Sequence, residues 1–281
     1  MVLDELARRF PQLYVEPADD AGEAYRIAAL RGAGPEGATL DHFRGAGDDF
    51  LRAYDTPAGQ VDVLFLALRL DFERALRCLA FRCRPEEIPA TTGAMTISGL
   101  ADWSKIAAER ERARAAGEDW PDAFRAFTAD PANYRTTLVV ASEGPYSAVD
   151  ASLTPYDADE WIAVSRQIRI FHELAHVVCI RLMAGDRLAI YDELTADFCG
   201  LVHATGTYDT HLAARFLGVD GRGYAGGRLE NYLKDGCRDI DEVAREAYGA
   251  IRKMAEVAEG VTPKTAFEHT LDLKRRRLLD Y

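Results

Sequence analysis

The most regular hydrophobic pattern of the chain lies in the stretch ADEWIAVSRQIRIFHELAHVVCIRLMAG, residues 158–185. Its apolar residues recur at steps of three and four, which is the period of a helix with one face against a core. They are Trp161, Val164, Ile168, Phe171, Ala175, Val178 and Leu182. Asp157 or Asp159 can cap the start of this helix, and Gly185 suits the position just past its end. The pattern therefore predicts one long helix that is held against a core. The stretch YDELTADFCGLVHATG follows and predicts a second, shorter helix that Gly206 stops.

The first half of the chain is less regular. Its first ~60 residues mix short helical pieces with glycine-rich breaks. VDVLFLALRLDFERALRCLAF, residues 61–81, is apolar on most sides of its first half, which predicts a long buried helix. GAMTISGLADW has a strand-like centre, and YRTTLVVASEG, residues 134–144, is the clearest strand. SKIAAERERARAAGEDW, between them, predicts a polar, solvated helix, and Trp103 just before it is expected to anchor packing.

These elements predict a mainly helical α+β protein with a small sheet. The sequence shows no internal repeat and no long low-complexity linker. We therefore expect residues 1–281 to form a single compact unit. Within it we expect a helical N-terminal subdomain over residues 1–100 and the functional core over residues 101–281.

Composition narrows the class of protein. The chain is 48% hydrophobic and 28% charged, as is ordinary for a soluble globular protein of 281 residues. Its net charge of -12 argues against nucleic acid and against an anionic membrane surface as partners. The first residues show no secretory signal, and no window reaches the ~18 apolar residues of a membrane span. We therefore expect a cytoplasmic location.

The chain has five cysteines, and no pair has the C-x-x-C spacing of a zinc or redox motif. We expect them to be small buried hydrophobes in a reducing compartment. They are Cys78, Cys83, Cys179, Cys199 and Cys237.

The motif FHELAH, residues 171–176, contains the candidate metal-binding and catalytic residues. Residues four apart lie on one face of a helix, so His172 and His176 can both direct a ring nitrogen at one ion. Glu173 is rotated by ~100° from His172, which places its carboxylate beside the ion, where it can take a proton from a zinc-bound water. This is the H-E-x-x-H arrangement. The alternative is that both histidines are core residues, each of which would then need a polar partner.

A catalytic zinc needs a third protein ligand. The form that continues as H-x-x-G-x-x-H is excluded, because VVCIRLMAG follows the motif. The other form takes a glutamate from a second helix, and Glu193 lies seventeen residues after His176, enough for a turn and a returning helix. Asp197, one helical turn after Glu193, can accept the second ring N–H of a histidine, for which we expect His172. An acidic helix start would account for Glu193, but accounts poorly for Asp197.

HELAH followed by ELTAD resembles the gluzincin zinc metallopeptidases, the group that includes thermolysin-like enzymes, over residues 160–205. The resemblance implies a zincin-like catalytic core, with a small sheet beside the H-E-x-x-H helix and one zinc per chain. It implies His172, His176 and Glu193 as zinc ligands, Glu173 as general base, and Asp197 as the residue that holds a ligand. Such enzymes often pair their substrate with an edge strand, for which YRTTLVVAS is available.

The sequence thus predicts a zinc metallopeptidase that hydrolyses short peptides or one specific protein. Tyr208, His211 and Tyr224 are the candidates for stabilising the tetrahedral oxyanion. Two alternatives stay open. One is a zinc-dependent tailoring hydrolase for a modified-peptide or non-peptide substrate. The other is a non-catalytic zincin-like binding or sensor domain, against which the intact Glu173 argues.

Overall fold

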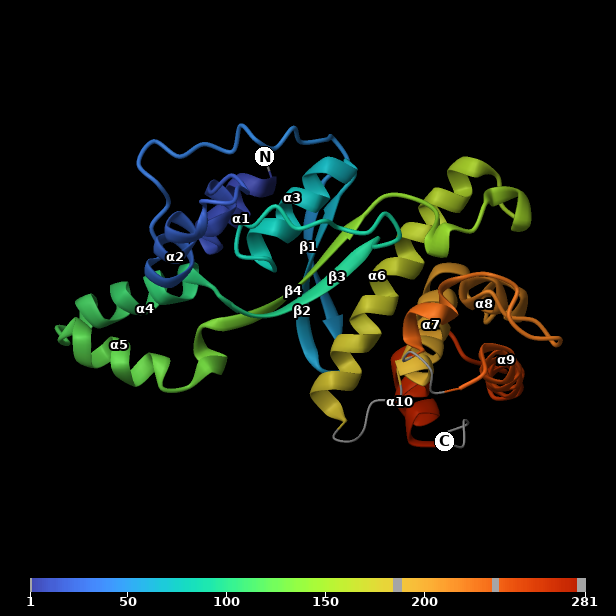
Figure 1. Ribbon diagram of the computed structural model, residues 1–281. Coiled ribbons are helices and arrows are strands. Elements are labelled where there is room, and N and C mark those ends of the chain that lie inside the picture. The colour runs from blue at the N-terminus through green and yellow to red at the C-terminus, as the bar shows by residue number, and fades with distance from the viewer. Residues whose placement is uncertain (1, 184–188, 234–237, 277–281) are drawn as a thin grey trace. The chain divides into compact units, whose positions relative to one another are not determined.

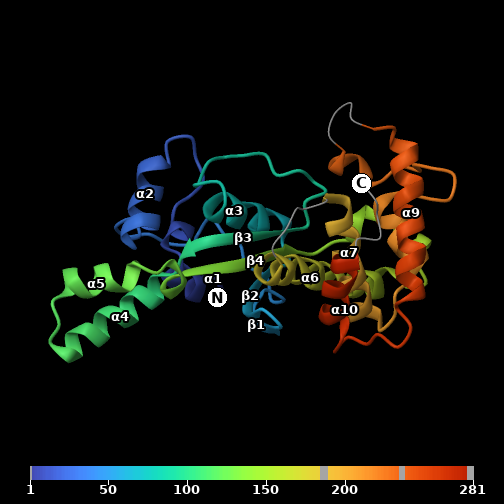
Figure 2. The ribbon, with the colours of Figure 1, turned by 90° about the horizontal axis from the view of Figure 1, so that it is seen from below.

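The computed structural model describes residues 2–183, 189–233 and 238–276 (Figures 1 and 2). The protein is α+β, 56% helical, with ten α-helices among the described residues and a four-stranded mixed sheet. This confirms the predicted mainly helical α+β class. None of the described helices combines the length and the apolar character that crossing a membrane would need.

The contacts divide the chain into two compact units. The first comprises Met1–Ala53 and Val61–Ser142, and the second comprises Tyr54–Gln60 and Glu143–Tyr281. The division falls after residue 142 and not near residue 100. The physical reason is that residues 94–101 pair with residues 135–142 in one sheet, which keeps both segments in the first unit.

The first unit contains α1 (Val2–Arg9), α2 (Gly22–Arg31), α3 (Arg69–Leu79), α4 (Trp103–Ala116), α5 (Trp120–Thr128) and the 3-10 helices η1 (Pro11–Tyr14) and η2 (Pro131–Asn133). The strands of its sheet are β1 (Phe50–Thr56), β2 (Gly59–Leu66), β3 (Ala94–Ala101) and β4 (Arg135–Ser142), in the order β1-β2-β4-β3. The end of β1 and the start of β2, within Tyr54–Gln60, are assigned to the second unit. β4 runs parallel to β2 and antiparallel to β3. The core packs α1, η1 and α3 against one face of the sheet, at Leu64, Leu66, Leu138 and Val140.

The prediction of a long helix over residues 61–81 is wrong. β2 ends at Leu66, and α3 begins at Arg69. β2 lies between β1 and β4, and Val63 to Leu66 are fully buried. A strand covered on both faces is continuously apolar, so it lacks the alternation that would distinguish it from a buried helix.

The two predicted strands and the predicted polar helix are confirmed as β3, β4 and α4. The segment expected to be a helical subdomain, residues 1–100, also contains β1, β2 and β3. Trp103 anchors packing as expected: its Nε1 donates to the Ala29 carbonyl at 3.2 Å. The ring covers Gly32, where a Cβ atom would lie 2.3 Å from it and where φ is +67°. β4 is an interior strand, so the expectation that residues 134–142 provide an edge strand for substrate is wrong.

The second unit contains α6 (Ala158–Leu182), α7 (Ala189–Thr205), α8 (Thr210–Leu217), α9 (Ile240–Glu256) and α10 (Ala266–Arg276). Its 3-10 helices are η3 (Tyr146–Ala148), η4 (Ala151–Leu153) and η5 (Arg228–Tyr232). α7 packs against both α6 and α10, as Figure 1 shows.

Both predicted helices of this unit are confirmed. Asp157 and Glu160 form a capping box at the start of α6, and Gly206, with φ +80°, follows the end of α7. The expected apolar stripe of α6 holds at its buried members, such as Trp161 and Ile168, but Leu182 is 47% exposed. Gly185, the expected residue past the end of α6, lies outside the described residues.

The described cysteines are free thiols, as predicted. Cys78, Cys83 and Cys199 are buried, Cys179 is half-buried, and Cys237 lies outside the described residues.

Candidate metal centre

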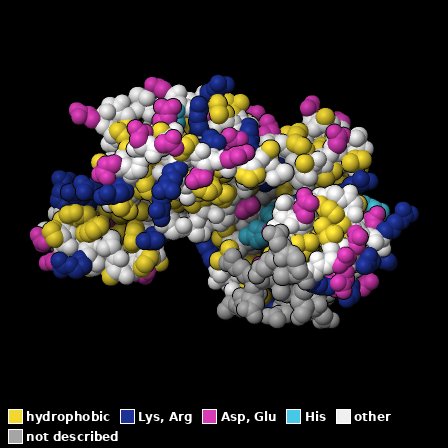
Figure 3. Space-filling model, in the orientation of Figure 1, with side chains coloured by type: hydrophobic (Ala, Val, Ile, Leu, Met, Phe, Trp, Pro, Cys, Tyr) yellow, Lys and Arg dark blue, Asp and Glu magenta, His cyan; other side chains and the backbone are white. Residues whose placement is uncertain are grey.

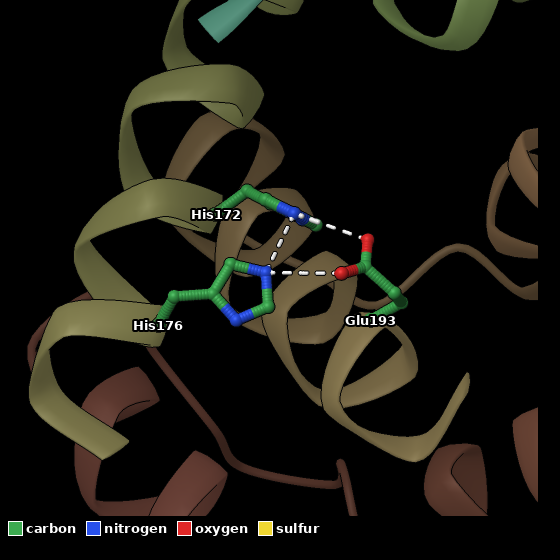
Figure 4. Close-up of side chains that lie close together, drawn as sticks. All are labelled: His172, His176 and Glu193. Carbon is green, nitrogen blue, oxygen red and sulfur yellow. Dashed lines mark hydrogen bonds and ion pairs between the residues drawn. The ribbon is translucent and has the colours of Figure 1, made fainter. Parts of the chain in front are cut away.

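Three ligand-type side chains converge between α6 and α7 (Figure 4). His172 and His176 lie one turn apart on α6, and their Nε2 atoms are 3.0 Å from each other. Glu193 reaches them from α7: its Oε2 is 3.5 Å from His172 Nε2, and its Oε1 is 3.3 Å from His176 Nε2. The structure thus brings together the three residues that the sequence predicts as ligands.

These separations fit one metal ion. Four ligands at bond lengths of 2.0–2.1 Å in a tetrahedron lie about 3.3–3.4 Å from one another. The three measured distances, 3.0, 3.3 and 3.5 Å, bracket that value. Two imidazole nitrogens that face each other need a proton or a cation between their lone pairs, and a shared ion satisfies both.

Close helix packing sets this geometry. Gly200 of α7 lies against α6, and a Cβ atom there would be 2.6 Å from the Ile168 carbonyl oxygen. Glu193, Asp197 and Gly200 share one face of α7, as Ile168 and His172 share one face of α6. The small residue therefore lets α7 approach closely enough for Glu193 and Asp197 to reach the histidines.

The second ring nitrogen of His172 is held by a buried polar network. His172 Nδ1 lies 2.9 Å from Asp197 Oδ1 and 2.8 Å from the Tyr146 hydroxyl, which itself donates to Asp197 Oδ1 at 2.7 Å. Because Asp197 is an acceptor, Nδ1 carries a proton. In the neutral imidazole, the form that can bind a metal, Nε2 is then the nitrogen with the lone pair, and it faces His176 and Glu193. The predicted role of Asp197 beside His172 agrees with these contacts.

Arg228 completes this network from η5. It donates to Asp197 Oδ2 and, at 3.1 Å, to the Tyr146 hydroxyl. Burial acts to raise the pKa of Asp197, but Arg228 and His172 together outweigh it and hold that pKa below its usual value. Burial also raises the pKa of Tyr146, so its hydroxyl keeps its proton. Asp197 therefore stays an acceptor for both His172 and Tyr146.

Tyr146 reaches the network from a strained segment. The two residues after it, Ser147 and Ala148, have φ angles of +51° and +57°, which non-glycine residues rarely adopt. The Tyr146 N–H donates to Ser165 Oγ of α6 at 2.9 Å, and its ring packs against Phe216. These contacts hold the strained turn against α6 and place the hydroxyl beside His172.

The Glu193 carboxylate has a tyrosine partner. The Tyr232 hydroxyl donates to Glu193 Oε2 at 2.9 Å. Burial acts to raise the pKa of Glu193, but its hydrogen bonds with His172 and His176 outweigh this and hold that pKa below the usual range. Glu193 is therefore ionised, as a metal ligand must be.

Glu173 is half-buried on α6, one position after His172. The His176 side chain is 23% exposed. Figure 3 shows histidine and acidic side chains beside one another at the surface over α6. Within the cluster, His176 is thus the side chain most open to solvent.

The three residues predicted to stabilise an oxyanion are engaged elsewhere. The Tyr208 hydroxyl contacts Met254 Sδ at 3.9 Å, and His211 is exposed at the start of α8. The Tyr224 hydroxyl donates to the Gly227 carbonyl at 2.6 Å. Within the part of the chain that the structure describes, no hydrogen bond or ion pair links these three side chains to His172 or His176.

Sequence reasoning missed Tyr146, Arg228 and Tyr232. The available signal was the pair Arg228 and Tyr232 in GGRLENY, four residues apart after a glycine-rich run. Tyr146 stands in GPYSA, before the motif helix, with no spacing that relates it to the histidines.

Residues 6–266 match a family of unknown function, DUF7005, and the chain belongs to this family. No curated protein and no solved structure matches the chain.

Proposed function

We propose that this protein is a zinc-dependent metallopeptidase with a zincin-like core of the gluzincin type, which hydrolyses peptide bonds in short peptides or in one specific protein. The observation that carries the proposal is the convergence of His172, His176 and Glu193, with donor atoms 3.0–3.5 Å apart. The proposal places the enzyme in the cytoplasm, which the free thiols of the described cysteines support.

The donor set favours zinc. Two imidazole nitrogens and one carboxylate are the three protein ligands of a well-known class of catalytic zinc sites, in which a fourth position stays open. Magnesium and calcium prefer all-oxygen ligands. The polar network at His172 Nδ1 supports the same assignment, because metal-bound histidines usually donate their other N–H to a carboxylate.

Each side chain then has a distinct role. A zinc ion held by His172, His176 and Glu193 would lower the pKa of water and polarise a substrate carbonyl. Glu173 accepts the proton of the attacking water on its carboxylate and passes it to the leaving amine. Asp197, held by Tyr146 and Arg228, keeps His172 in the tautomer that presents Nε2.

The test combines metal content with activity. Elemental analysis of the purified protein should find about one zinc per chain after reconstitution. A broad peptide library should yield a narrow set of cleaved peptides, a chelator should abolish cleavage, and added zinc should restore it.

Three outcomes would change the proposal. Absence of any transition metal after reconstitution would refute the metal centre. Rapid, unspecific digestion of casein would refute the restriction to short peptides or one protein. Inertness toward every peptide, with zinc bound, would favour a tailoring hydrolase with a modified-peptide or non-peptide substrate.

A further inference from the structure

The two oxygens of Glu193 have different surroundings. Oε2 accepts a hydrogen bond from the Tyr232 hydroxyl at 2.9 Å and lies 3.8 Å from Arg228 Nη1. Oε1 faces His176 Nε2 at 3.3 Å. Oε2 also lies 3.5 Å from His172 Nε2, so each oxygen is near one histidine nitrogen. Only Oε2, however, has a hydroxyl donor and a nearby guanidinium as further partners.

A carboxylate can bind a metal through one oxygen or through both. A donor on one oxygen occupies one of its two lone pairs and draws off part of its charge, so a metal binds the other oxygen more strongly. The number of coordinating oxygens matters for chemistry, because a catalytic zinc site needs a position that no protein ligand fills.

The geometry points to Tyr232 as a positioning residue that restricts Glu193 to one metal-binding oxygen, Oε1, and thereby keeps a coordination position free for water or substrate. The inference rests on the metal centre of the proposed function and deepens it. Tyr232 acts through Glu193 and is not itself assigned a contact with substrate.

The scaffold behind Tyr232 is built to hold its hydroxyl still. Gly227, just before η5, lies against Gly218, and a Cβ atom on Gly227 would be 2.6 Å from the Gly218 nitrogen. The Tyr224 hydroxyl binds both the N–H and the carbonyl of Gly227, at 2.9 and 2.6 Å. Leu229 of η5 is fully buried. A donor fixed in this way is preorganised, so little entropy is lost when it binds the carboxylate.

Removal of the hydroxyl should change how Glu193 binds and leave the ligand set intact. In Tyr232→Phe, Oε2 is released and can join Oε1 on the metal. The second metal–oxygen bond should offset the lost hydrogen bond. We therefore expect the metal dissociation constant to change by less than ~10-fold, below the ~10- to 100-fold typical of losing an orienting partner.

Cobalt(II) is a suitable probe, because its visible absorption is strong in four-coordinate sites and weaker when coordination increases. The experiment loads wild-type protein, Tyr232→Phe and Tyr208→Phe with one Co²⁺ each, without substrate. Tyr208→Phe is the matched control, since it also removes a buried hydroxyl but one whose contact is the Met254 sulfur. We expect one Co²⁺ in all three proteins and a loss of visible absorption per cobalt in Tyr232→Phe alone.

An unchanged cobalt spectrum in Tyr232→Phe would overturn the inference. So would loss of stoichiometric cobalt from a folded Tyr232→Phe protein, which would make Tyr232 essential for the ligand set itself. X-ray absorption of the wild-type zinc protein tests the same point without a variant. Four light-atom neighbours are expected, and five or six would contradict a one-oxygen Glu193.

These readouts separate the inference from the proposed function. If wild-type protein binds no metal, the metal centre fails and the inference fails with it. If wild-type protein binds cobalt and the variant spectrum is unchanged, the inference alone fails. Neither readout depends on peptide cleavage, so an inert but metal-loaded protein leaves the inference standing.

Discussion

Two histidines on the α6–α7 pair show how differently a protein interior can treat the same side chain. His172 of α6 has polar partners on both ring nitrogens, namely Asp197 and Tyr146 on Nδ1 and His176 and Glu193 on Nε2. His203 of α7 lies in an aromatic cluster instead. Its ring stacks on Phe171 at 3.7 Å and lies 5.0 Å from Phe267.

The two environments shift the imidazole pKa in opposite directions. Burial acts to lower the pKa of His172, but in the absence of a bound metal Asp197 and Glu193 outweigh it and raise that pKa to about 9. Burial lowers the pKa of His203 to about 4. His203 Nε2 is buried, and among the described residues it has no hydrogen-bond partner.

The difference separates a binding role from a packing role. An anionic surrounding that stabilises a proton on an imidazole stabilises a metal cation in the same place, and the aromatic surrounding of His203 offers neither. Burial alone therefore says little about a histidine, and the identity of its partners decides what it can do.

The largest expected effect is on metal stoichiometry. His176→Ala removes one of three ligands, so it should abolish stoichiometric zinc binding, measured by elemental analysis after dialysis. His203→Phe should leave zinc at one per chain. Equal zinc loss from both variants would show that the site depends on general packing of the helix pair and not on the polar partners.

The next largest effect distinguishes catalysis from zinc binding at the cluster around His172. Glu173→Gln keeps size and helix propensity but cannot accept a proton, so turnover of a cleaved peptide should fall by ~100-fold or more with zinc retained. Glu193→Gln, by contrast, should lose both turnover and zinc. Zinc loss from Glu173→Gln would make Glu173 a ligand and would contradict its assignment as the base.

A smaller effect is expected from Asp197→Asn, which loosens His172 without removing it. Zinc affinity, measured by competition with a chelator, should fall by ~10- to 100-fold. Asp192→Asn is the matched control. Asp192 is adjacent to Glu193 but pairs with Lys274, so its substitution should leave affinity near the wild-type value. An unchanged zinc affinity in Asp197→Asn would show that Asp197 does not support metal binding.

The smallest effect concerns protein stability and the aromatic cluster around His203. His203→Phe removes a buried nitrogen without a partner, so it should raise the free energy of unfolding by about 1 kcal/mol at pH 7. The gain should increase as pH falls from about 6.5 toward 4. In that window the unfolded wild-type histidine takes up a proton that folded His203 does not, which lowers wild-type stability.

Denaturant unfolding at pH 7 and pH 5 measures both quantities. His211→Gln, a substitution of an exposed histidine, serves as the control and should show a much smaller change in pH dependence. If His203→Phe were less stable than wild type at both pH values, the imidazole would have a polar partner that stabilises the folded protein.

Sequence patterns were enough to predict the features that depend on interactions between residues close together in the chain. Four-residue spacing alone predicts that His172 and His176 share a face, because that follows from the helical repeat. The same rule pairs Glu193 with Asp197 on the next helix. Periodicity also predicted α6 and α7 and the stop at Gly206. It left the cap of α6 open between Asp157 and Asp159, and the structure shows Asp157.

The features that the sequence did not predict depend on tertiary contacts. Residues 61–66 are a strand because β1 and β4 supply hydrogen-bonding partners on both sides, and an apolar run does not reveal such neighbours. Tyr146, Arg228 and Tyr232 reach the histidines through a strained turn and a tightly packed glycine-rich loop, whose paths depend on contacts far apart in sequence. The sequence by itself thus identified the three side chains that cluster, His172 and His176 through local helical spacing and Glu193 through the motif on the next helix. Only the fold determined which hydroxyls and which guanidinium hold these side chains in place.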